Sequence, residues 1–315
     1  MSTPLPDSAR HPCFNPEAHR AFGRAHLPVA ASCNVQCGFC DRRYSCVNES
    51  RPGVTARLLT PHEAVDAALR AVARMPHLSV IGIAGPGDPL ANAAPTIETL
   101  AELRKTLPGI LLCLSTNGLA LPLHAQTLAD LGVGHVTVTV NAVRPDVGAA
   151  VYNWVDDGSK RLSGQQGVAL LLERQEKGIR LLKSLGVTIK VNSVVIPGVN
   201  DTHMLDIAKA VASWGADLMN CIPLLPVADT RFAIVSPPSA QLMHSIRAEA
   251  GEVIPQMRHC TRCRADALGL LGEDGQLEDV CGAQPQAQPQ IRAQARAQAQ
   301  IQAQKTRLMN TVSRQ

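Results

Sequence analysis

Aromatic residues are scarce in this chain: four Phe, two Trp and two Tyr make up 3% of its 315 residues. No cluster of Lys and Arg is interleaved with aromatic side chains, so we do not expect nucleic-acid binding. No run of 18 apolar residues occurs either, so we expect no helix that spans a membrane. Residues 1–20 contain no apolar stretch, so the sequence predicts no secretory signal peptide and indicates a cytoplasmic protein.

Cysteine, by contrast, is abundant, with ten residues. Thiols are kept reduced in the cytoplasm, so metal binding or catalysis explains that number better than disulfides do. The hydrophobic content of 45% and the net charge of +4, with an isoelectric point near 8.6, fit a folded and mildly basic protein. The length allows one large domain or two small ones.

Short β-rich runs alternate with helical patterns along most of the chain. The predicted strands are 27–31, 78–84, 110–116, 135–141, 187–196 and 217–223, and the predicted helices are 60–75, 95–107, 122–131, 165–185 and 201–214. This alternation favours parallel strands joined by right-handed crossovers. We therefore predict an α/β fold, a partial (β/α)6 TIM-like barrel, with a doubly wound sheet as the alternative. In either fold, ligands bind at the carboxyl ends of the strands.

Local signals support several of these helix boundaries. Thr60-Pro61-His62-Glu63 has Thr at the N-cap, Pro at the first helical position and Glu placed for a capping box. Gly186 and Gly215 follow two predicted helices, as C-cap glycines do.

Three cysteines follow the first predicted strand in Cys33-Asn-Val-Gln-Cys37-Gly-Phe-Cys40. Three thiolates at these spacings fit around one cubane cluster and leave its fourth iron without a protein ligand. Such an open iron can chelate the amino and carboxylate groups of a methionine and pass an electron to a sulfonium. A zinc site is one alternative, although structural zinc normally has four protein ligands, and buried structural thiols are another.

This segment resembles the signature of the radical S-adenosylmethionine (SAM) superfamily, with Phe39 as the aromatic residue before the last cysteine. Gly85-Pro86-Gly87-Asp88-Pro89 is similar to the superfamily's glycine-rich acidic motif, which holds the amino group of SAM, although Glu is more usual in place of Asp88. The resemblance implies that Cys33, Cys37 and Cys40 carry a catalytic 4Fe-4S cluster and that Gly85, Gly87 and Asp88 contact SAM.

Within that superfamily, further segments resemble the NifB family of nitrogenase cofactor maturases. They are residues 11–14, 26–30, 46–54, 114–118, 190–193 and 196–201, and the resemblance extends from residue 11 to residue 281. It implies that two 4Fe-4S units, an extra sulfur and a carbide derived from SAM are assembled into an 8Fe-9S-C precursor. Many relatives continue into a small product-binding domain, where this chain has an Ala/Gln-rich segment, so we expect a stand-alone form.

The remaining cysteines fit that chemistry by count. Cys260, Cys263 and Cys281 form a second triad, for which a zinc ribbon is the alternative. The resemblance implies that Cys13, Cys46 and Cys113 form a third triad, with His26 as a further metal ligand; spacing alone does not indicate this set. Cys221 is left over, on a predicted strand, and is expected to be an apolar core residue.

Several residues fall at the carboxyl ends of predicted strands, where they would line the SAM pocket. They are Ser115, Thr116, Asn117, Thr139, Asn141, Val191 and Asn192. Glu49, Ser50 and Arg51 form a polar run that would orient the intermediate, or else a solvated loop.

We predict four parts along the chain. They are an N-terminal extension with cluster ligands (1–26), a radical SAM partial barrel (27–250), a C-terminal cluster-binding segment (251–282) and a low-complexity Ala/Gln-rich tail (283–315), which has no apolar face and is expected to be disordered. The expected cofactors are one SAM-binding and two auxiliary or substrate 4Fe-4S clusters, together with SAM.

The expected partners follow from this reaction. They are SAM, iron–sulfur cluster donors, an electron donor such as a ferredoxin or flavodoxin, and a downstream cofactor carrier, with no nucleic acid and no membrane. Two other hypotheses stay open. One is another radical SAM enzyme with auxiliary clusters, such as a peptide or cofactor maturase, and the other is a non-catalytic metal-binding scaffold.

Overall fold

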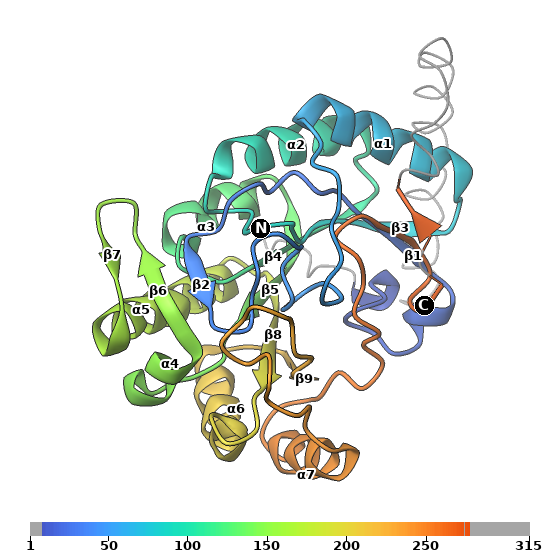
Figure 1. Ribbon diagram of the computed structural model, residues 1–315. Helices are drawn as coiled ribbons and strands as arrows, with labels where there is room; N and C mark the ends of the chain where they lie inside the picture. The colour runs from blue at the N-terminus through green and yellow to red at the C-terminus, as the bar shows by residue number, and fades with distance from the viewer. Residues whose placement is uncertain (1–7, 274, 278–315) are drawn as a thin grey trace.

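The structure is a computed structural model, and it describes residues 8–273 and 275–277 (Figure 1). Its main sheet has the strand order β11-β10-β1-β3-β4-β5-β8-β9. The parallel strands of this sheet are β1 (Gly23–His26), β3 (Leu78–Ile83), β4 (Leu111–Thr116), β5 (Val133–Thr139), β8 (Thr188–Val195) and β9 (Leu218–Pro223). The predicted α/β class and partial (β/α)6 barrel are thereby confirmed.

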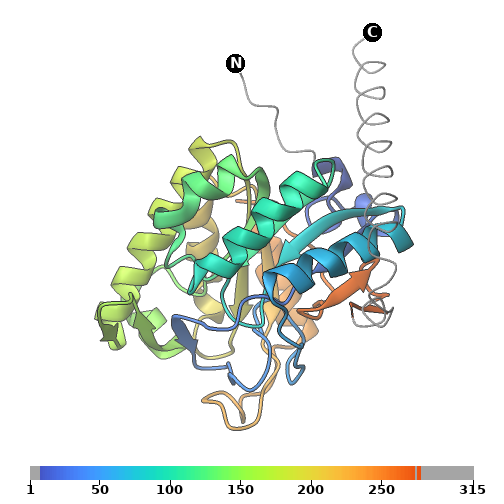
Figure 2. The same ribbon diagram turned by 90° about the horizontal axis from the view of Figure 1, so that it is seen from above.

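Helices cover the outer face of this curved sheet (Figure 2). They are α1 (Pro61–Arg74), α2 (Ala93–Thr106), α3 (Leu121–Asp130), α4 (Pro145–Val151), α5 (Gly164–Ser184), α6 (Met204–Trp214) and α7 (Ala240–Gly251), with short 3-10 turns η1 (Ser8–Arg10), η2 (Ala18–Arg20) and η3 (Asp201–His203). None of the helices in the described part of the chain is long and apolar enough to cross a membrane.

The predicted caps are confirmed. The Oγ1 atom of Thr60 accepts a hydrogen bond from the backbone N–H of Glu63 (3.3 Å), and the Glu63 carboxylate accepts one from the N–H of Thr60 (2.8 Å). Gly215 ends α6 with a φ of 99°, and Gly186 follows α5 with a φ of 80°. Glycine adopts this left-handed conformation without the steric cost that a Cβ atom brings.

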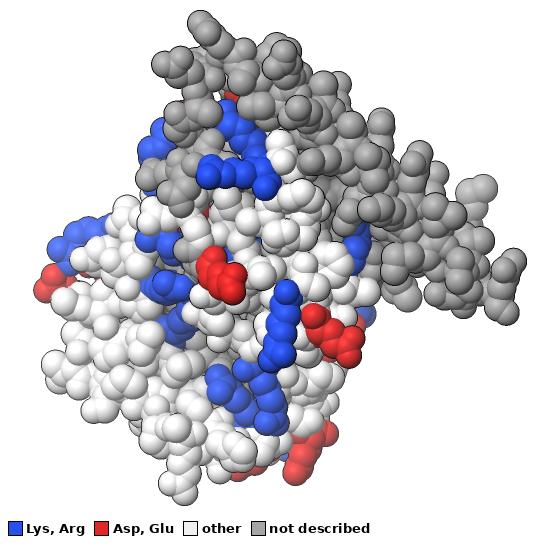
Figure 3. Space-filling model, turned by 90° about the vertical axis from the view of Figure 1, so that its right-hand side faces the viewer, with Lys and Arg blue, Asp and Glu red and all other residues white. Residues whose placement is uncertain are grey.

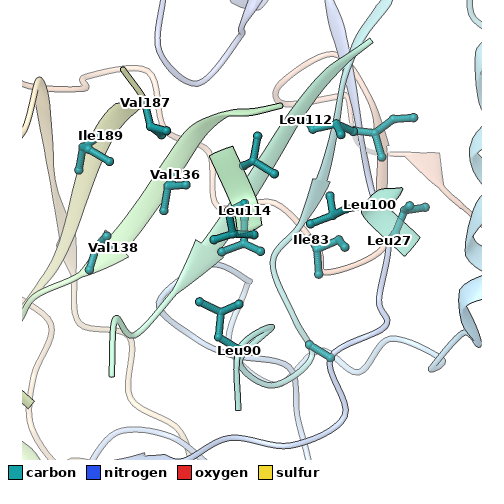
Figure 4. Close-up of a cluster of buried hydrophobic side chains, with 14 of the residues drawn as sticks. Leu27, Ile83, Leu90, Leu100, Leu112, Leu114, Val136, Val138, Val187 and Ile189 are labelled. Atoms are coloured by element: carbon teal, nitrogen blue, oxygen red, sulfur yellow. The ribbon is translucent and has the colours of Figure 1, made fainter. Parts of the chain in front are cut away.

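The hydrophobic core lies between the sheet and its helices (Figure 4). Strand side chains such as Ile83, Leu114 and Val136 are fully buried there, as is Leu100 from α2. Burial of each such side chain stabilises the fold by about 2 kcal/mol. The core fixes the sheet, so the strand ends that carry polar residues stay in register.

The sequence misplaced the first strand and missed several elements. β1 ends at His26, and residues 27–31 form only one bridge, between Ala30 and Pro86, because Pro28 has no N–H to donate to a ladder. The missed elements are α4, α7, a second sheet of β2 (Val35–Cys37), β6 (Tyr152–Asp156) and β7 (Arg161–Leu162), and the short strands β10 (Ala267–Gly269) and β11 (Gly275–Gln276). These strands are too short for a clear alternating pattern.

The main sheet crosses two of the predicted domain boundaries. β1 lies before residue 27, and β10, which pairs antiparallel with β1, lies after residue 250. Both extensions thus contribute strands to the barrel edge. The boundaries themselves stay predictions, and the tail 283–315 lies outside the described residues.

Candidate functional site

The three signature cysteines lie on a loop after β1, at the carboxyl ends of the parallel strands. Cys37 ends β2, which pairs with β6, and Phe39 is buried 6.5 Å from the ring of Phe232. A Cβ atom on Gly38 would lie 2.9 Å from the Phe232 ring and 3.0 Å from a backbone oxygen, so only glycine fits between them. This packing holds the loop against the barrel.

The signature loop borders a cavity, named here the SAM cavity, that encloses about 420 Å³ including its mouth. Its lining residues are Cys33, Val35, Cys37, Cys40, Arg42, Cys46, Asn48, Glu49, Gly87, Asp88, Ser115, Thr116, Asn117 and Thr139. All three signature thiols therefore open into one space. This is the arrangement that the cysteine spacing predicted.

The signature thiols are protonated at neutral pH in the metal-free protein. Burial raises the pKa of Cys33 to about 11, with a further contribution from the negative charge of Asp88. Burial also raises the pKa of Cys37 and Cys40, and neighbouring cysteines add to the effect at Cys37. Metal binding at these thiols must therefore displace protons, which couples loading to pH.

The glycine-rich acidic turn packs directly on the backbone that precedes Cys33. The N–H of Gly87 donates to the Ala30 carbonyl (2.6 Å), and the N–H of Asp88 donates to the Ser32 carbonyl (2.7 Å). A Cβ atom on Gly87 would lie 2.1 Å from the Ser32 oxygen, so no other residue fits without a shift of the backbone. The turn and the signature loop thus form one unit.

Asp88 follows β3 and links it by hydrogen bonds to the end of β4. Its buried carboxylate accepts hydrogen bonds from the N–H of Asn117 (2.6 Å), the hydroxyl of Thr116 (2.9 Å) and the N–H of Leu90 (2.9 Å). Burial raises the pKa of Asp88, and these hydrogen bonds oppose that shift. The side-chain amide of Asn117 in turn lies 3.7 Å from the Sγ atom of Cys33.

A second cavity, named here the cysteine chamber, encloses about 660 Å³ including its mouth. The chamber's ligand-type side chains are His11, Cys13, His26, Glu49, Cys113, Lys190, Cys260 and Cys263, and Arg24, Asn48, Ser115, Asn192, Met257 and Arg262 also line it. These residues come from both ends of the described chain and from several strands. The fold therefore gathers four thiols that the sequence separates.

The two histidines of the chamber have opposite hydrogen-bonding roles. The Nδ1 atom of His26 lies 3.0 Å from the carbonyl oxygen of Arg264, which can only accept, so Nδ1 carries the proton and Nε2 carries the lone pair. The Nδ1 atom of His11 accepts from the N–H of Cys13 (3.2 Å), so its proton is on Nε2. That Nε2 is buried and has no hydrogen-bond partner among the described residues. In these tautomers the Nε2 atom of His26 carries a lone pair that could bind a metal, whereas the Nε2 atom of His11 can only donate.

Positively charged side chains surround the chamber thiols. Arg24 is fully buried, and its guanidinium lies 3.1 Å from the Sγ atom of Cys263. Burial lowers the pKa of Arg262 to about 10. Cys260 is exposed, on the segment between α7 and β10 that runs along one side of the molecule (Figure 1). Lys and Arg cover more of that side than Asp and Glu do (Figure 3).

Two further charged side chains line the chamber: the buried Lys190, and the half-buried Glu49, which also lines the SAM cavity. Burial lowers the pKa of Lys190, but the negative charges of Cys13, Glu49, Cys260 and Cys113 outweigh it and raise the pKa. Burial raises the pKa of Glu49. The side-chain amide of Asn192 donates to Glu49 (3.0 Å).

Three residues, Asn48, Glu49 and Ser115, line both cavities. The SAM cavity and the cysteine chamber therefore share a wall. The side-chain amide of Asn48 lies 3.6 Å from the Sγ atom of Cys46. A group bound in either cavity would therefore lie next to these side chains.

The structure brings most of the predicted site residues to these cavities, with some differences. Cys13 and Cys113 line the chamber, whereas Cys46, their predicted partner, lines the SAM cavity. Asn192 lines the chamber, together with Cys260 and Cys263. Cys281 lies outside the described residues. The predicted triads stay predictions.

Three predicted SAM contacts do not line either cavity. Val191 is buried in the hydrophobic core, because alternate residues of a strand face opposite sides and its neighbours Lys190 and Asn192 face the chamber. Asn141 is fully buried, and its Oδ1 atom accepts a hydrogen bond from the N–H of Val194 (2.8 Å). Gly85 supports the turn with a φ of 152°.

Sequence reasoning missed Lys190, Arg24, Arg42 and Arg262 as site residues. The signal for Lys190 was a charged residue inside an otherwise apolar strand run, because a buried Lys is rare unless it serves a site. No comparable signal marked Arg24, because the short β1 strand has no clear apolar pattern.

The donor set of the SAM cavity fits a 4Fe-4S cluster. Three thiols on one loop open into one space, and the Asn48 amide lies 3.9 Å from the Sγ atom of Cys37, where it would donate to a thiolate. In the described residues, no three His, Cys, Asp or Glu side chains converge closely enough to hold a single metal ion. The residues that would hold the cluster are Cys33, Cys37 and Cys40.

Comparison with known proteins identifies the family. Residues 27–211 match the radical SAM superfamily. The chain is 47% identical over 263 residues to the FeMo cofactor biosynthesis protein NifB of Chlorobaculum tepidum, which covers 84% of this chain and 62% of the relative. It is also 47% identical to NifB of Klebsiella pneumoniae, over 85% of this chain and 58% of that protein. The chain thus spans about three fifths of the length of these relatives.

A solved structure supports the fold. The crystal structure of SuiB from Streptococcus suis superposes with a TM-score of 0.54 at 11% sequence identity, covering 77% of this chain and 51% of that one. At this identity the likeness concerns the fold alone. Because the superfamily match spans more than half of the sequence and the cysteine signature lies at the carboxyl ends of a partial barrel, this chain belongs to the radical SAM superfamily, with NifB proteins among its relatives.

Proposed function

We propose that this protein is a maturase of the nitrogenase cofactor. It fuses two 4Fe-4S units with a SAM-derived carbide and an extra sulfur into the 8Fe-9S-C precursor. The observation that carries the proposal is the shared wall between the SAM cavity and a chamber lined by four further thiols. An enzyme that moves carbon from SAM into an iron–sulfur substrate needs both sites in direct contact.

The signature side supplies the radical chemistry. When a 4Fe-4S cluster is bound there, it supplies the electron that cleaves SAM reductively to methionine and a 5′-deoxyadenosyl group. The chain's own part is to bind and orient: Cys33, Cys37 and Cys40 act as thiolate ligands, and the turn at Gly87 keeps the backbone close enough for SAM to reach the loop. Phe39 and its hydrophobic neighbours exclude water from one side.

The chamber side holds the iron–sulfur substrate. We assign Cys13, Cys113, Cys260 and Cys263 as its thiol ligands, and the tautomer of His26 supports a ligating role for Nε2. Buried arginines offset the negative charge of thiolate-bound clusters, as the contact between Arg24 and Cys263 illustrates. A substrate must also leave, and the exposed position of Cys260 gives the chamber one side near solvent.

Glu49 lies in the wall that the two cavities share. Its carboxylate lies 3.0 Å from the amide of Asn192 and 3.5 Å from the hydroxyl of Thr139. Because it borders both cavities, it would orient the substrate toward the methionine sulfonium of SAM. Cluster donors, an electron donor such as a ferredoxin or flavodoxin, and a carrier for the product complete the proposed reaction.

The test is anaerobic reconstitution of the whole chain, followed by iron analysis, a SAM cleavage assay and extraction of the product. We expect about 12 irons per chain, from three cubane clusters, and a carbide-containing precursor. Iron that saturates near four per chain would refute the chamber assignment. Full iron loading with SAM cleavage but without the precursor would refute the proposed product. It would favour the alternative that the protein is another radical SAM maturase.

A further inference from the structure

Lys190 is a buried ammonium group without an ion-pair partner in the described residues. It lies on β8, its residue is 6% exposed, and its side chain borders the cysteine chamber. Its recorded hydrogen-bond contact is with the Sδ atom of Met257 at 3.9 Å. Its Nζ atom also lies 5.3 Å from the centre of the Phe14 ring. A thioether is a weak acceptor, and a ring face accepts no more than one N–H group.

An isolated ammonium in this position is costly. Burial of a charged group without a paired charge or hydrogen bonds disfavours the folded state by several kcal/mol. That cost is a large share of the free energy of unfolding of a typical domain. Glu49 acts on Lys190 through space, but no carboxylate of the described residues comes within ion-pair distance of its Nζ atom. The chamber must therefore hold an acceptor for Lys190 when the protein is functional.

The position of Lys190 identifies that acceptor. Lys190 lines the chamber together with Cys13 and Cys113, from the N-terminal and central parts of the chain, and with Cys260 from the C-terminal part. The ammonium group therefore borders the same space as the thiols that the proposed function assigns to the iron–sulfur substrate. Sulfide in such units carries negative charge and accepts hydrogen bonds from cationic donors.

We propose that Lys190 donates hydrogen bonds to sulfide of the iron–sulfur substrate, and so binds the anionic substrate in the chamber. This inference rests on the proposed function. Lys190 is a substrate-binding residue in it, because its ammonium contacts the sulfide directly. Neither its neighbour Val191, in the core, nor the exposed Lys183, paired with Asp217, can replace it.

The test compares Lys190→Met, which keeps the length of the side chain but removes its charge, with Lys190→Arg, which keeps the charge. Lys183→Met is the matched control, because it removes the same charge from a surface ion pair. Each protein is loaded with a synthetic 4Fe-4S cluster, with and without added sodium sulfide. We expect Lys190→Met to bind the chamber clusters about tenfold more weakly, as loss of a hydrogen bond from a charged donor predicts, and Lys190→Arg to bind them more tightly than Lys190→Met.

Two further readouts separate substrate binding from a structural role. Removal of a positive charge near a cluster destabilises its reduced form, so Lys190→Met should lower the reduction potential of the chamber clusters and leave that of the signature cluster unchanged. The metal-free Lys190→Met protein should unfold at the same temperature as the parent or a higher one, because its unpaired ammonium is gone.

The contrary results are equally clear. Parental loading and potentials in Lys190→Met would overturn the inference and leave the proposed function standing, as would a lower unfolding temperature of the metal-free variant. An effect that occurs only with added sodium sulfide would assign Lys190 to free hydrosulfide and overturn the cluster contact. A parent protein that loads only the signature cluster would overturn both proposals.

Discussion

The SAM cavity and the cysteine chamber are built in opposite ways. The ligands of the first lie on one loop of eight residues, Cys33 to Cys40, held by local packing around Phe39. The thiols of the chamber come from three separate segments, at Cys13, at Cys113 on β4, and at Cys260 and Cys263 before β10. Both cavities nevertheless meet at the same wall, so one barrel positions a local site and a non-local site side by side.

This difference has a chemical consequence. A loop that carries all its ligands keeps them together when the rest of the chain moves, which suits a resident cofactor. A chamber assembled from separate segments can release a ligand without losing the others, which suits a substrate that is bound, rebuilt and released. The following changes test this contrast.

The largest effect should come from replacing all three signature cysteines. The triple variant Cys33→Ala, Cys37→Ala, Cys40→Ala should form no 5′-deoxyadenosine, because no other ligand on that loop can hold the cluster. The chamber iron, about eight per chain, should remain. Cys221→Ala is the control, because Cys221 is fully buried on β9 and borders neither cavity. Product formation at the parental rate in the triple variant would refute the signature assignment.

The next effect should come from Cys113 on β4, which is separated by β5 and β8 from the control Cys221 on β9 of the same sheet. Cys113→Ala should lose about four irons and the carbide-containing precursor but retain the signature cluster and SAM cleavage. A purely structural Cys113 would instead cost about 1 kcal/mol of stability, as Cys221→Ala should. Iron analysis beside a SAM cleavage assay distinguishes the two, and full iron content with parental precursor yield would remove Cys113 from the chamber ligands.

A smaller effect is expected at Gly87. Gly87→Ala places a methyl group against the Ser32 oxygen, so the turn must move away from the signature loop. We expect a loss of about 1–3 kcal/mol in the free energy of unfolding and weaker SAM binding. Gly251→Ala, where the nearest atom lies 3.6 Å from the new Cβ, should be neutral or slightly stabilising. Unchanged SAM affinity in Gly87→Ala would show that the contact between turn and loop does not shape the site.

The smallest effect concerns alkaline pH. Burial raises the pKa of both Cys113 and Cys221 to about 12, from an ordinary value of 9.0. Between these values the unfolded chain loses a proton that the folded protein keeps, so the stability of the metal-free protein should fall as pH rises above about 9. Each thiol contributes about 1.4 kcal/mol per pH unit in that window.

Iron loading should distinguish the contributions of Cys113 and Cys221 to this pH dependence. It should remove the contribution of Cys113, whose thiol would be metal-bound, but not that of Cys221. Thermal denaturation between about pH 8 and pH 10 measures both slopes, with Cys221→Ala as the reference for one thiol. The signature thiols lose their contribution on loading in every variant, so a smaller loss of slope in Cys113→Ala than in the parent would support the assignment. An equal loss of slope on loading in the parent and in Cys113→Ala would contradict it.

Sequence patterns predicted the barrel well where elements are long. The helices around Leu100 and Ile179 and the strands around Ile83 and Val136 were predicted because long apolar periodicities are unambiguous. β1 was misplaced because it is short and contains the fully buried Arg24, which breaks any apolar pattern. β10 and β11 were missed because strands of two or three residues have no period to detect.

The same distinction holds for the site. The signature loop was predicted in full, because its spacing by itself places three thiols around one space. Glu49 was recognised only as part of a polar run, and Lys190 was not recognised as a site residue. Their importance depends on which face of the sheet and which cavity they border, and neither property is encoded in local spacing.

The sequence by itself therefore determined the α/β class, the main helices and the cluster-binding loop, because periodicity and ligand spacing are local properties. Only the tertiary structure decided that Cys46 borders the SAM cavity while Cys13, Cys113, Cys260 and Cys263 border a common chamber. It also decided that Lys190 points among those thiols and Val191 into the core. The physical reason is that contacts between distant segments arise from strand order and core packing, which bring together residues that have no relation in sequence.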